Sequence, residues 1–275
     1  MAEKVTIFWF RRDLRFDDNT ALHNALKEDA PVLPIFIFDK EILEKLPKDD
    51  ARVNFIFDTL QQMRSELVDN NSSSIALYHG SPNNVFKALL RSYDIQNVYT
   101  NHDYEPYAKE RDKAIEQILS AKNIPFHTSK DQVIFEKNEV VKDDGKPYVV
   151  YTPYKNKWKV LFNTNQLQEH GTKPFFQNLI SSTDLPNVTL EEIGFKKSSI
   201  QIPDYQVSSE LIANYEATRN FPAKKNGTSR LGPHLRFGTV SVRKMMKKAI
   251  AEENEVFWSE LIWREFFMQI LWHFP

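Results

Sequence analysis

Short apolar runs alternate with helical patterns over the first 135 residues, and this alternation sets the strongest limit on the fold. The runs are almost continuously apolar, which is typical of strands buried on both faces of a parallel sheet. The segments between them carry apolar residues at helical spacing, as Leu60, Met63 and Leu67 do. Together they predict an α/β domain with a doubly wound, parallel five-stranded sheet of the Rossmann-like type. Strands are predicted at 5–10, 32–38, 75–78, 98–100 and near 126, and helices at 19–27, 52–68, 82–93 and 107–121.

The regular alternation stops after residue 135. Residues 143–147 indicate a turn, and prolines at 174, 186 and 203 interrupt a stretch with little periodicity. Helical patterns return after Tyr205 and continue to the end of the sequence. We therefore predict an α/β domain over residues 1–135, a connector over 136–205 and a helical domain over 206–275.

Composition excludes several classes of protein. The net charge of −1 rules out a polycation, so any binding of anions depends on local clusters of charge. Cysteine is absent, which removes thiolate metal ligands, and no metal site is predicted. The most apolar stretch, residues 256–274, carries Glu260, Arg264 and Glu265, which argues against a membrane span. The N-terminus lacks the pattern of a signal peptide, so we expect a cytoplasmic protein, with no membrane or protein partner and a monomeric state.

Polar residues follow the predicted strands, where sheets of this kind bind their ligands. Arg11–Asp13 follow the first strand, and Asn101–Asp103 follow the fourth. The simplest interpretation is a network of ion pairs that fixes the strand ends, with Asp18 or Asn19 capping the next helix. The glycine motifs of dinucleotide-binding and P-loop proteins do not occur.

Residues 217–251 contain nine lysines and arginines and no acidic residue. Such a run indicates a surface that faces phosphates, while a solvated charged face is the alternative for the lysines of 244–248. Within the run, Thr228 and Ser229 precede a helical segment, whose N-terminus either binds a phosphate or is capped by one of the hydroxyls. The nine basic residues are Arg219, Lys224, Lys225, Arg230, Arg236, Arg243, Lys244, Lys247 and Lys248.

A helical segment near the end of the sequence, residues 257–267, is apolar except for one narrow stripe. Glu260, Trp263, Arg264 and Phe267 share this face by their spacing. The apolar remainder predicts a helix that is buried on nearly all sides. Its polar stripe either pairs internally, as a Glu260–Arg264 ion pair, or lines a cavity.

These motifs together resemble the DNA photolyase and cryptochrome family. Residues 9–15, W-F-R-R-D-L-R, stand ahead of Asp18-Asn19 and are similar to the opening signature of the family. Residues 226–233, N-G-T-S-R-L-G-P, resemble its flavin-binding loop, and E-L-I-W-R-E-F at 260–266 resembles its substrate-site helix. Residues 151–158, which begin Y-T-P-Y and end in a tryptophan, resemble a segment between its two domains. The resemblance implies a photolyase-type antenna domain over 1–135 and the start of an all-α FAD-binding domain at 206.

The resemblance also implies roles for individual residues. Glu260 and Trp263 are implied as catalytic residues that contact the damaged pyrimidine pair. Gly232 stands where the family usually has serine, so that only a backbone N–H contact is expected there. The residues implied to approach FAD are Tyr215, Thr228, Ser229, Arg230, Leu231, Gly232, Phe257 and Arg264. Those implied to contact DNA are Arg219, Glu260, Leu261, Ile262, Trp263, Arg264, Glu265, Phe266 and Phe267.

A family member with these residues is expected to be an enzyme, a deoxyribodipyrimidine photo-lyase. Such a carbon–carbon lyase repairs UV-damaged DNA by splitting cyclobutane pyrimidine dimers, with an electron from light-excited reduced FAD, after the dimer has left the duplex. A cryptochrome-type photoreceptor of the same fold, with little repair activity, is the alternative. A nucleotide-binding module without photochemistry is a third interpretation. The presence of both Glu260 and Trp263 favours repair.

Two further expectations come from the resemblance. Family members continue past the position of Pro275 with helices that complete the flavin pocket, so we expect a sequence truncated within the FAD-binding domain. The 275-residue chain alone is then expected to bind FAD weakly or not at all. Residues 104–106, Y-E-P, resemble family sequence beside the antenna chromophore, but Tyr107-Ala108 replaces the Asn-Glu pair of some folate-binding members. The antenna chromophore is therefore open among folate, deazaflavin, flavin and none.

Overall fold

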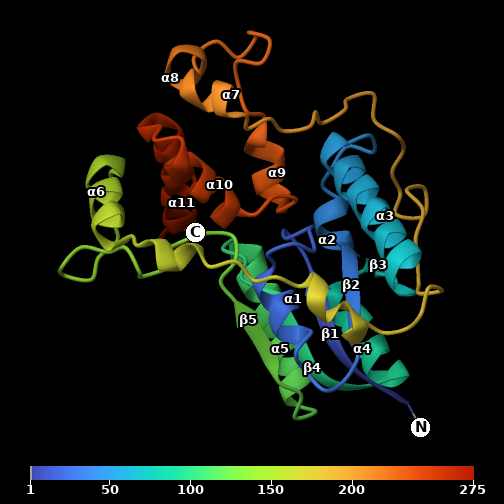
Figure 1. The fold of residues 1–275 in the computed structure, drawn as a ribbon. Helices are drawn as coiled ribbons and strands as arrows, with labels where there is room; N and C mark the ends of the chain where they lie inside the picture. Colours follow the sequence, from blue (N-terminus) through green and yellow to red (C-terminus); the bar gives the residue numbers. More distant parts are fainter. Residues whose placement is uncertain (1) are drawn as a thin grey trace. The chain divides into compact units, whose positions relative to one another are not determined.

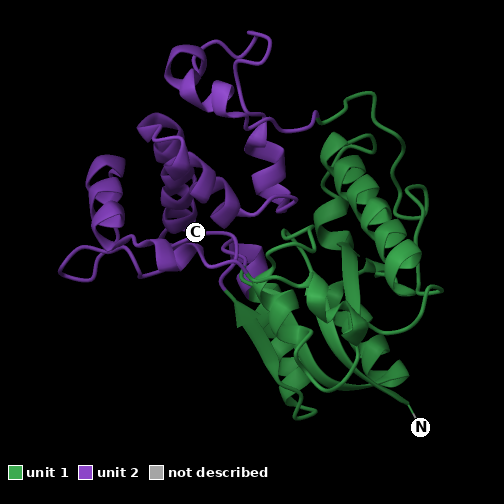
Figure 2. Cartoon of the chain, viewed as in Figure 1, with its two compact units in different colours: residues 1–102, 110–129, 170–202 green, residues 103–109, 130–169, 203–275 purple. Residues whose placement is uncertain are grey.

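The computed structural model describes residues 2–275, which form two compact units (Figure 2). Unit 1 comprises the chain up to residue 102 together with 110–129 and 170–202. Unit 2 comprises residues 103–109, 130–169 and 203–275. The stretch 136–205 therefore forms no body of its own, because its first half joins unit 2 and most of its second half joins unit 1.

Unit 1 is built on a five-stranded sheet in the order β3-β2-β1-β4-β5, and every neighbouring pair is parallel (Figure 1). The strands are β1 (Glu3–Phe10), β2 (Val32–Asp39), β3 (Ala76–Gly80), β4 (Tyr93–Asn101) and β5 (Phe126–Ser129). The helices that connect them along the chain are α1 (Thr20–Ala25), α2 (Lys40–Leu43), α3 (Ala51–Asn71), α4 (Pro82–Ser92) and α5 (Pro106–Ser120). The predicted doubly wound, parallel sheet is confirmed.

The burial of the central strands explains their nearly continuous apolar sequence. Every residue of β2 is buried, and β1 is buried from Val5 to Phe10. Ile7 and Trp9 lie in one apolar cluster with residues of α4 and α5, and the Trp9 ring meets Phe86 edge-on at 5.1 Å between centroids. Residues at alternate positions of a strand face opposite sides, so Phe8 and Phe10 are buried on the other face of the sheet.

Residues 170–202 belong to unit 1 because irregularly spaced apolar side chains anchor them to its sheet. The Ile180 N–H donates to the Val32 carbonyl at 2.8 Å, and the Leu77 N–H donates to the Pro186 carbonyl at 2.7 Å. Ile180 and Leu185 are buried in the same cluster as the strands. The segment includes a 3₁₀ helix, η2 (Lys173–Asn178).

The regular elements of unit 2 are helices, as predicted for the chain after residue 206. Residues 136–169 add α6, whose Trp158 is 0% exposed. Among residues 2–275, no helix has both the length and the hydropathy needed to cross a membrane. The helices of the unit are α6 (Tyr151–Leu161), η1 (Thr164–Leu167), α7 (Ser209–Ala213), α8 (Tyr215–Thr218), α9 (Leu231–Phe237), α10 (Val242–Ala251) and α11 (Glu255–His273).

Candidate cofactor and nucleic-acid site

A cavity of about 520 Å³ lies in unit 2, lined by residues of α8, α11 and the segment 229–236. This volume is within the range of small-molecule sites, about 300–1,000 Å³. Its lining is mostly apolar, with polar groups from Ser229, Glu260 and two arginines. Six of the eight residues predicted to approach FAD line it, namely Tyr215, Ser229, Leu231, Gly232, Phe257 and Arg264.

The other two residues predicted to approach FAD, Thr228 and Arg230, do not line the cavity. Arg230 is exposed and takes a left-handed backbone conformation, with φ of 55°, at the position that precedes α9. Its side chain makes no capping hydrogen bond, and the Ser229 hydroxyl lies 3.5 Å from the Leu231 N–H. Arg230, and neither Thr228 nor Ser229, therefore occupies the capping position, because its left-handed backbone turns the chain into the helix.

Gly232 is exposed on the first turn of α9 and contributes to the cavity. A Cβ atom built at this glycine would meet no other heavy atom within 4 Å. The serine that is usual in the family would therefore fit here without displacing a neighbour. Relative to serine, glycine at this position lacks the hydroxymethyl group and keeps the backbone N–H.

Helix α11 supplies the largest share of the lining and begins at a well-defined cap. The Asn254 side chain accepts a hydrogen bond from the Phe257 N–H at 2.8 Å, and it donates to the Ile212 carbonyl at 2.7 Å. Glu260, Leu261 and Phe267 of the predicted DNA-contacting set line the cavity from this helix. Two lining residues that were not predicted, Met268 and Leu271, continue the same face at helical spacing.

Of the two alternatives for the polar stripe of α11, the Glu260–Arg264 ion pair does not form, and both residues line the cavity. Glu260 instead pairs with Arg219, at 2.6 Å between Nη1 and Oε1. The Arg264 guanidinium donates to two backbone carbonyls, those of Gln132 at 2.5 Å and Leu235 at 3.1 Å. Arg264 thus links α11 to two other segments of unit 2. Glu260 pairs with a residue that is distant in sequence.

Trp263 is half-buried and lies in an aromatic stack. Its ring is 3.5 Å from that of Tyr151 between centroids, with 10° between the planes, and 5.5 Å from that of Phe267. The Tyr151 hydroxyl donates to the Ser259 carbonyl at 2.7 Å, and burial raises the pKa of Tyr151 to about 12. Tyr151 was predicted only as part of a family motif, and its role as a support for Trp263 emerges from the structure.

Four residues of the predicted DNA-contacting set, Leu261, Ile262, Glu265 and Phe266, are at most 5% exposed. The Glu265 carboxylate accepts hydrogen bonds from the N–H groups of Ile134 and Phe135 and from Trp158 Nε1 at 2.7 Å. Burial raises the pKa of Glu265 to about 7, and these donors oppose the rise. These side chains are buried in unit 2, and their predicted contact with DNA stays a prediction.

The stretch 217–251 contains no acidic residue, but acidic residues from outside it lie next to its basic side chains in the folded chain. Acidic residues from other segments pair with Arg219, Arg236, Arg243 and three lysines of α10. Glu169 alone pairs with Lys247 at 2.6 Å and with Lys244 at 3.6 Å. Only Lys224, Lys225 and Arg230, all exposed on the loop before α9, make no ion pair with a described residue. Positive charge without a described carboxylate partner therefore lies on this loop, and the phosphate-facing surface stays a prediction.

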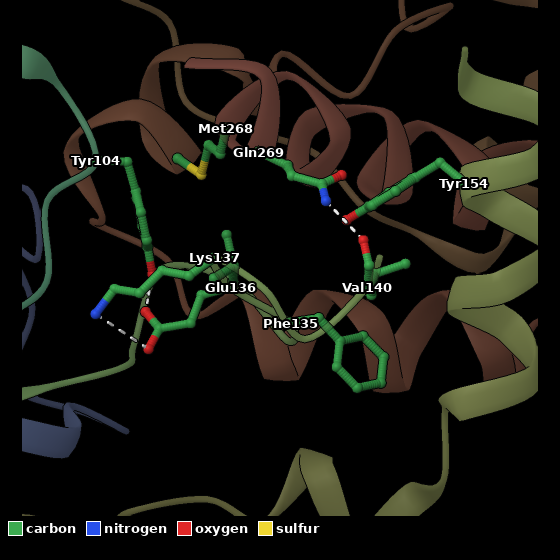
Figure 3. Close-up of a pocket in the computed structure, with 9 residues that line it drawn as sticks. Tyr104, Phe135, Glu136, Lys137, Val140, Tyr154, Met268 and Gln269 are labelled. Atoms are coloured by element: carbon green, nitrogen blue, oxygen red, sulfur yellow. Dashed lines mark hydrogen bonds and ion pairs between the residues drawn. The ribbon is translucent and has the colours of Figure 1, made fainter. Parts of the chain in front are cut away.

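A second, much smaller cavity lies beside α11 (Figure 3). Its volume is about 10 Å³, enough for one water molecule. The Tyr104 hydroxyl donates to Glu136 at 2.6 Å, and Gln269 Nε2 donates to the Val140 carbonyl at 2.6 Å. Gln269 Oε1 is buried and has no partner among the described residues. This cavity is too small for a cofactor.

The polar residues at the strand ends of unit 1 satisfy one another. Asn101 Nδ2 donates to Asp13 Oδ2 at 2.5 Å, and Arg11 forms an ion pair with Asp112. Asn19 caps α1 by accepting from the Leu22 N–H at 3.2 Å. The predicted network of ion pairs and the predicted cap are both present. No group of three His, Asp or Glu residues arranged to hold a metal ion occurs within residues 2–275.

Comparison with known proteins gives consistent matches. A family model described as DNA photolyase matches residues 6–173. The chain is 29% identical over 302 residues to a deoxyribodipyrimidine photo-lyase from Synechococcus sp. (strain ATCC 27144), covering 98% of this chain and 60% of that protein. It is 28% identical to an uncharacterised 31.6 kDa protein from Synechococcus sp. (strain PCC 6716), covering 97% of this chain and 100% of that protein.

A solved structure also resembles this chain. It is an archaeal photolyase from Sulfolobus tokodaii with two FAD molecules, with a TM-score of 0.74 and 27% identity, covering 98% of this chain and 60% of that one. The chain thus spans about 60% of the length of the photolyases that it matches here.

Proposed function

The chain belongs to the DNA photolyase family, and we propose that it serves in light-driven DNA repair as a deoxyribodipyrimidine photo-lyase. The observation that carries this proposal is the cavity in unit 2. Its lining combines Tyr215, Phe257 and Ser229, predicted to approach FAD, with Glu260, predicted to contact the lesion. Electron transfer to a lesion requires that cofactor and substrate lie close together, and one cavity with both sets of residues meets that need.

The lining of the cavity fits a flavin. Tyr215 and Phe257 meet edge to face at 5.1 Å between centroids and present aromatic surface to a planar ring. The Ser229 hydroxyl and the N–H groups of Leu231 and Gly232 suit the oxygens of a phosphate or ribose. When bound, reduced FAD supplies the electron that splits the dimer.

Glu260 and Trp263 are the residues proposed to meet the extruded pyrimidine pair. The Glu260 carboxylate accepts hydrogen bonds from pyrimidine N–H groups. The half-buried Trp263 ring gives a base a face to stack on, which is worth about 1–3 kcal/mol per base. Its stack on Tyr151 holds the ring in one orientation before the substrate arrives.

A repair assay tests the proposal directly. The intact protein, supplied with FAD and a reductant, should convert a dimer-containing oligonucleotide to the undamaged form under blue light and leave it unchanged in the dark. Flavin binding without light-dependent repair would favour the photoreceptor alternative. Absence of both flavin binding and repair would refute the proposal.

Ser229→Ala should lower the affinity of the intact protein for FAD by about 1–2 kcal/mol, because it removes one hydrogen bond to the cofactor. The Ser229 hydroxyl makes only a long hydrogen bond with the Leu231 N–H, so it contributes little to stability. The melting temperature should therefore not change. Thr228→Ala is the matched control, since it removes a neighbouring hydroxyl that does not line the cavity. Equal loss of FAD in both variants, measured by fluorescence titration, would contradict the assignment.

Replacing Lys224 and Lys225 together by alanine should weaken binding to damaged and to undamaged DNA by the same amount. The slope of log affinity against log salt should fall by about one unit per lysine, because each phosphate contact releases a counterion. The matched control replaces Lys244 and Lys247, which are held by Glu169, and should leave the slope unchanged. A larger effect of the control pair would place the DNA on α10 and not on the loop.

A further inference from the structure

The ion pair between Arg219 and Glu260 joins the two residues through which the proposed function would contact DNA. Arg219 follows the last residue of α8, and Glu260 lies in the second turn of α11. The two side chains are 34% and 33% exposed, so solvent and ligands have access to both. Glu260 is the only carboxylate in the described chain that pairs with Arg219, and it also lines the cavity.

The surroundings of the pair favour its opening toward an anion. The Arg219 guanidinium lies 6.0 Å from the centre of the Tyr215 ring, an aromatic contact that persists without the carboxylate. Lys224, Lys225 and Arg230 follow in the adjacent loop and carry unneutralised positive charge. Glu260 is therefore the described carboxylate that a phosphate must displace to bind Arg219.

We infer that Glu260 competes with the DNA backbone for Arg219 and thereby disfavours undamaged DNA. This inference rests on the proposed DNA-repair function. A phosphate that binds Arg219 must displace the carboxylate, which is then left without its partner. An intact duplex gives the released Glu260 carboxylate no new hydrogen-bond donor, because its pyrimidine N–H groups are paired inside the helix. An extruded pyrimidine dimer offers those N–H groups to the released Glu260, so the lost ion pair is replaced only when a lesion is bound.

The size of the effect follows from the strength of the pair. Half-exposed ion pairs contribute about 0.2–1 kcal/mol, so a competitor that must break one binds about 1.4- to 5-fold more weakly. Glu260→Gln keeps the size of the side chain and removes the competing charge. It should tighten binding to undamaged DNA by about 1.4- to 5-fold. The preference for dimer-containing DNA should fall by at least the same factor.

The experiment measures the affinity of the intact protein for a labelled duplex, with and without one thymine dimer. The variants are Glu260→Gln, Arg219→Ala and the double variant. Glu260→Gln should tighten binding to undamaged DNA in the wild-type background. In the Arg219→Ala background it should have no effect on this binding. Glu255→Gln is the matched control, because it removes the same charge from the same helix at a residue that pairs with Lys155 and Lys159.

Three results would overturn the inference. They are an unchanged affinity of Glu260→Gln for undamaged DNA, equal tightening in the Arg219→Ala background, and equal tightening by Glu255→Gln. The last two would show a general effect of net charge and no competition at Arg219.

A second measurement separates this inference from the proposed function. Inorganic phosphate is titrated while the Nε–H resonance of Arg219 is followed by NMR. The phosphate concentration at the midpoint of this titration should fall about 1.4- to 5-fold in Glu260→Gln, whether or not the protein binds DNA. A falling midpoint without DNA binding would support the competition and refute the repair function. DNA binding with both midpoint and affinity unchanged would refute the competition and leave the repair function standing.

Discussion

Trp158→Ala is expected to lower the free energy of unfolding by about 3–5 kcal/mol, the usual cost of truncating a large buried aromatic residue. Trp158 is 0% exposed and stacks on Phe162 at 4.9 Å between centroids. Its indole N–H donates to Glu265, so the truncation also removes a donor from a buried carboxylate. Chemical denaturation of the intact protein, followed by circular dichroism, measures the loss.

The consequence of this variant should extend to the proposed site. Trp158 and Tyr151 both belong to α6, and Tyr151 stacks on Trp263 of α11. Loosening α6 therefore removes the support of the proposed stacking platform, and FAD binding and DNA selectivity should fall with stability. Val160→Ala is the control on α6, because its side chain is 81% exposed and its loss should cost little stability. A Trp158→Ala variant as stable as the wild type would show that the packing of α6 on α11 is not what holds unit 2 together.

Trp158→Phe isolates the hydrogen bond from the packing, and its effect should depend on pH. The pKa of Glu265 is raised to about 7 by burial, and the Trp158 donor partly counters the rise. A carboxyl whose pKa is raised on folding contributes stability below its unfolded value, about 4.5, and loses it as the pH rises through the folded value. Removing the donor raises the pKa of Glu265 further, so the variant loses more free energy of unfolding than the wild type as the pH rises. The gap between wild type and variant should be small near pH 4.5 and widen as the pH passes 7.

The fold of unit 1 was predictable because its determinants are local. β1 and β2 are apolar nearly without interruption, since both of their faces are buried, and this pattern is visible in any short window of the sequence. The cap at Asn19 likewise depends on a residue and the helix that follows it. The helix α6 was missed because its sequence, YTPYKNKWKVL, mixes charges with a proline near its start and buries few of its side chains.

The arrangement of charges was not predictable, because it depends on residues that are far apart in sequence. Sequence spacing left Glu260 either paired with Arg264 one turn away or facing a cavity, and it could not indicate that Glu260 pairs with Arg219. A stretch of sequence without acids was expected to present open positive charge, but Glu169 neutralises two of its lysines. Periodicity places a residue on a face of a helix, and only the tertiary fold decides what lies opposite that face. The motif at 226–233 and the α11 stripe each lie within a few helical turns, and residues of both line one cavity, while their contact with FAD stays a prediction.

Trp263→Ala in the intact protein should lower the affinity for dimer-containing DNA by about 1–3 kcal/mol, the worth of one base stacked on an aromatic ring. Binding to undamaged DNA should hardly change, because it depends on phosphate contacts at the loop before α9. FAD content should also survive, since Trp263 does not line the cavity while Tyr215 and Phe257 do. The melting temperature, the flavin absorbance and the two DNA affinities are measured on the same variant.

Trp263→Phe is the control that keeps an aromatic ring against Tyr151, and it should retain most of the preference for damaged DNA. The competing explanation is that Trp263 only packs unit 2 through its 3.5 Å stack on Tyr151. In that case the alanine variant loses about 3–5 kcal/mol of stability, as a buried aromatic residue does. Melting temperature, flavin content and both DNA affinities would then fall together. A selective loss for the dimer assigns Trp263 to the substrate, whereas a uniform loss assigns it to the core and removes the proposed stacking platform.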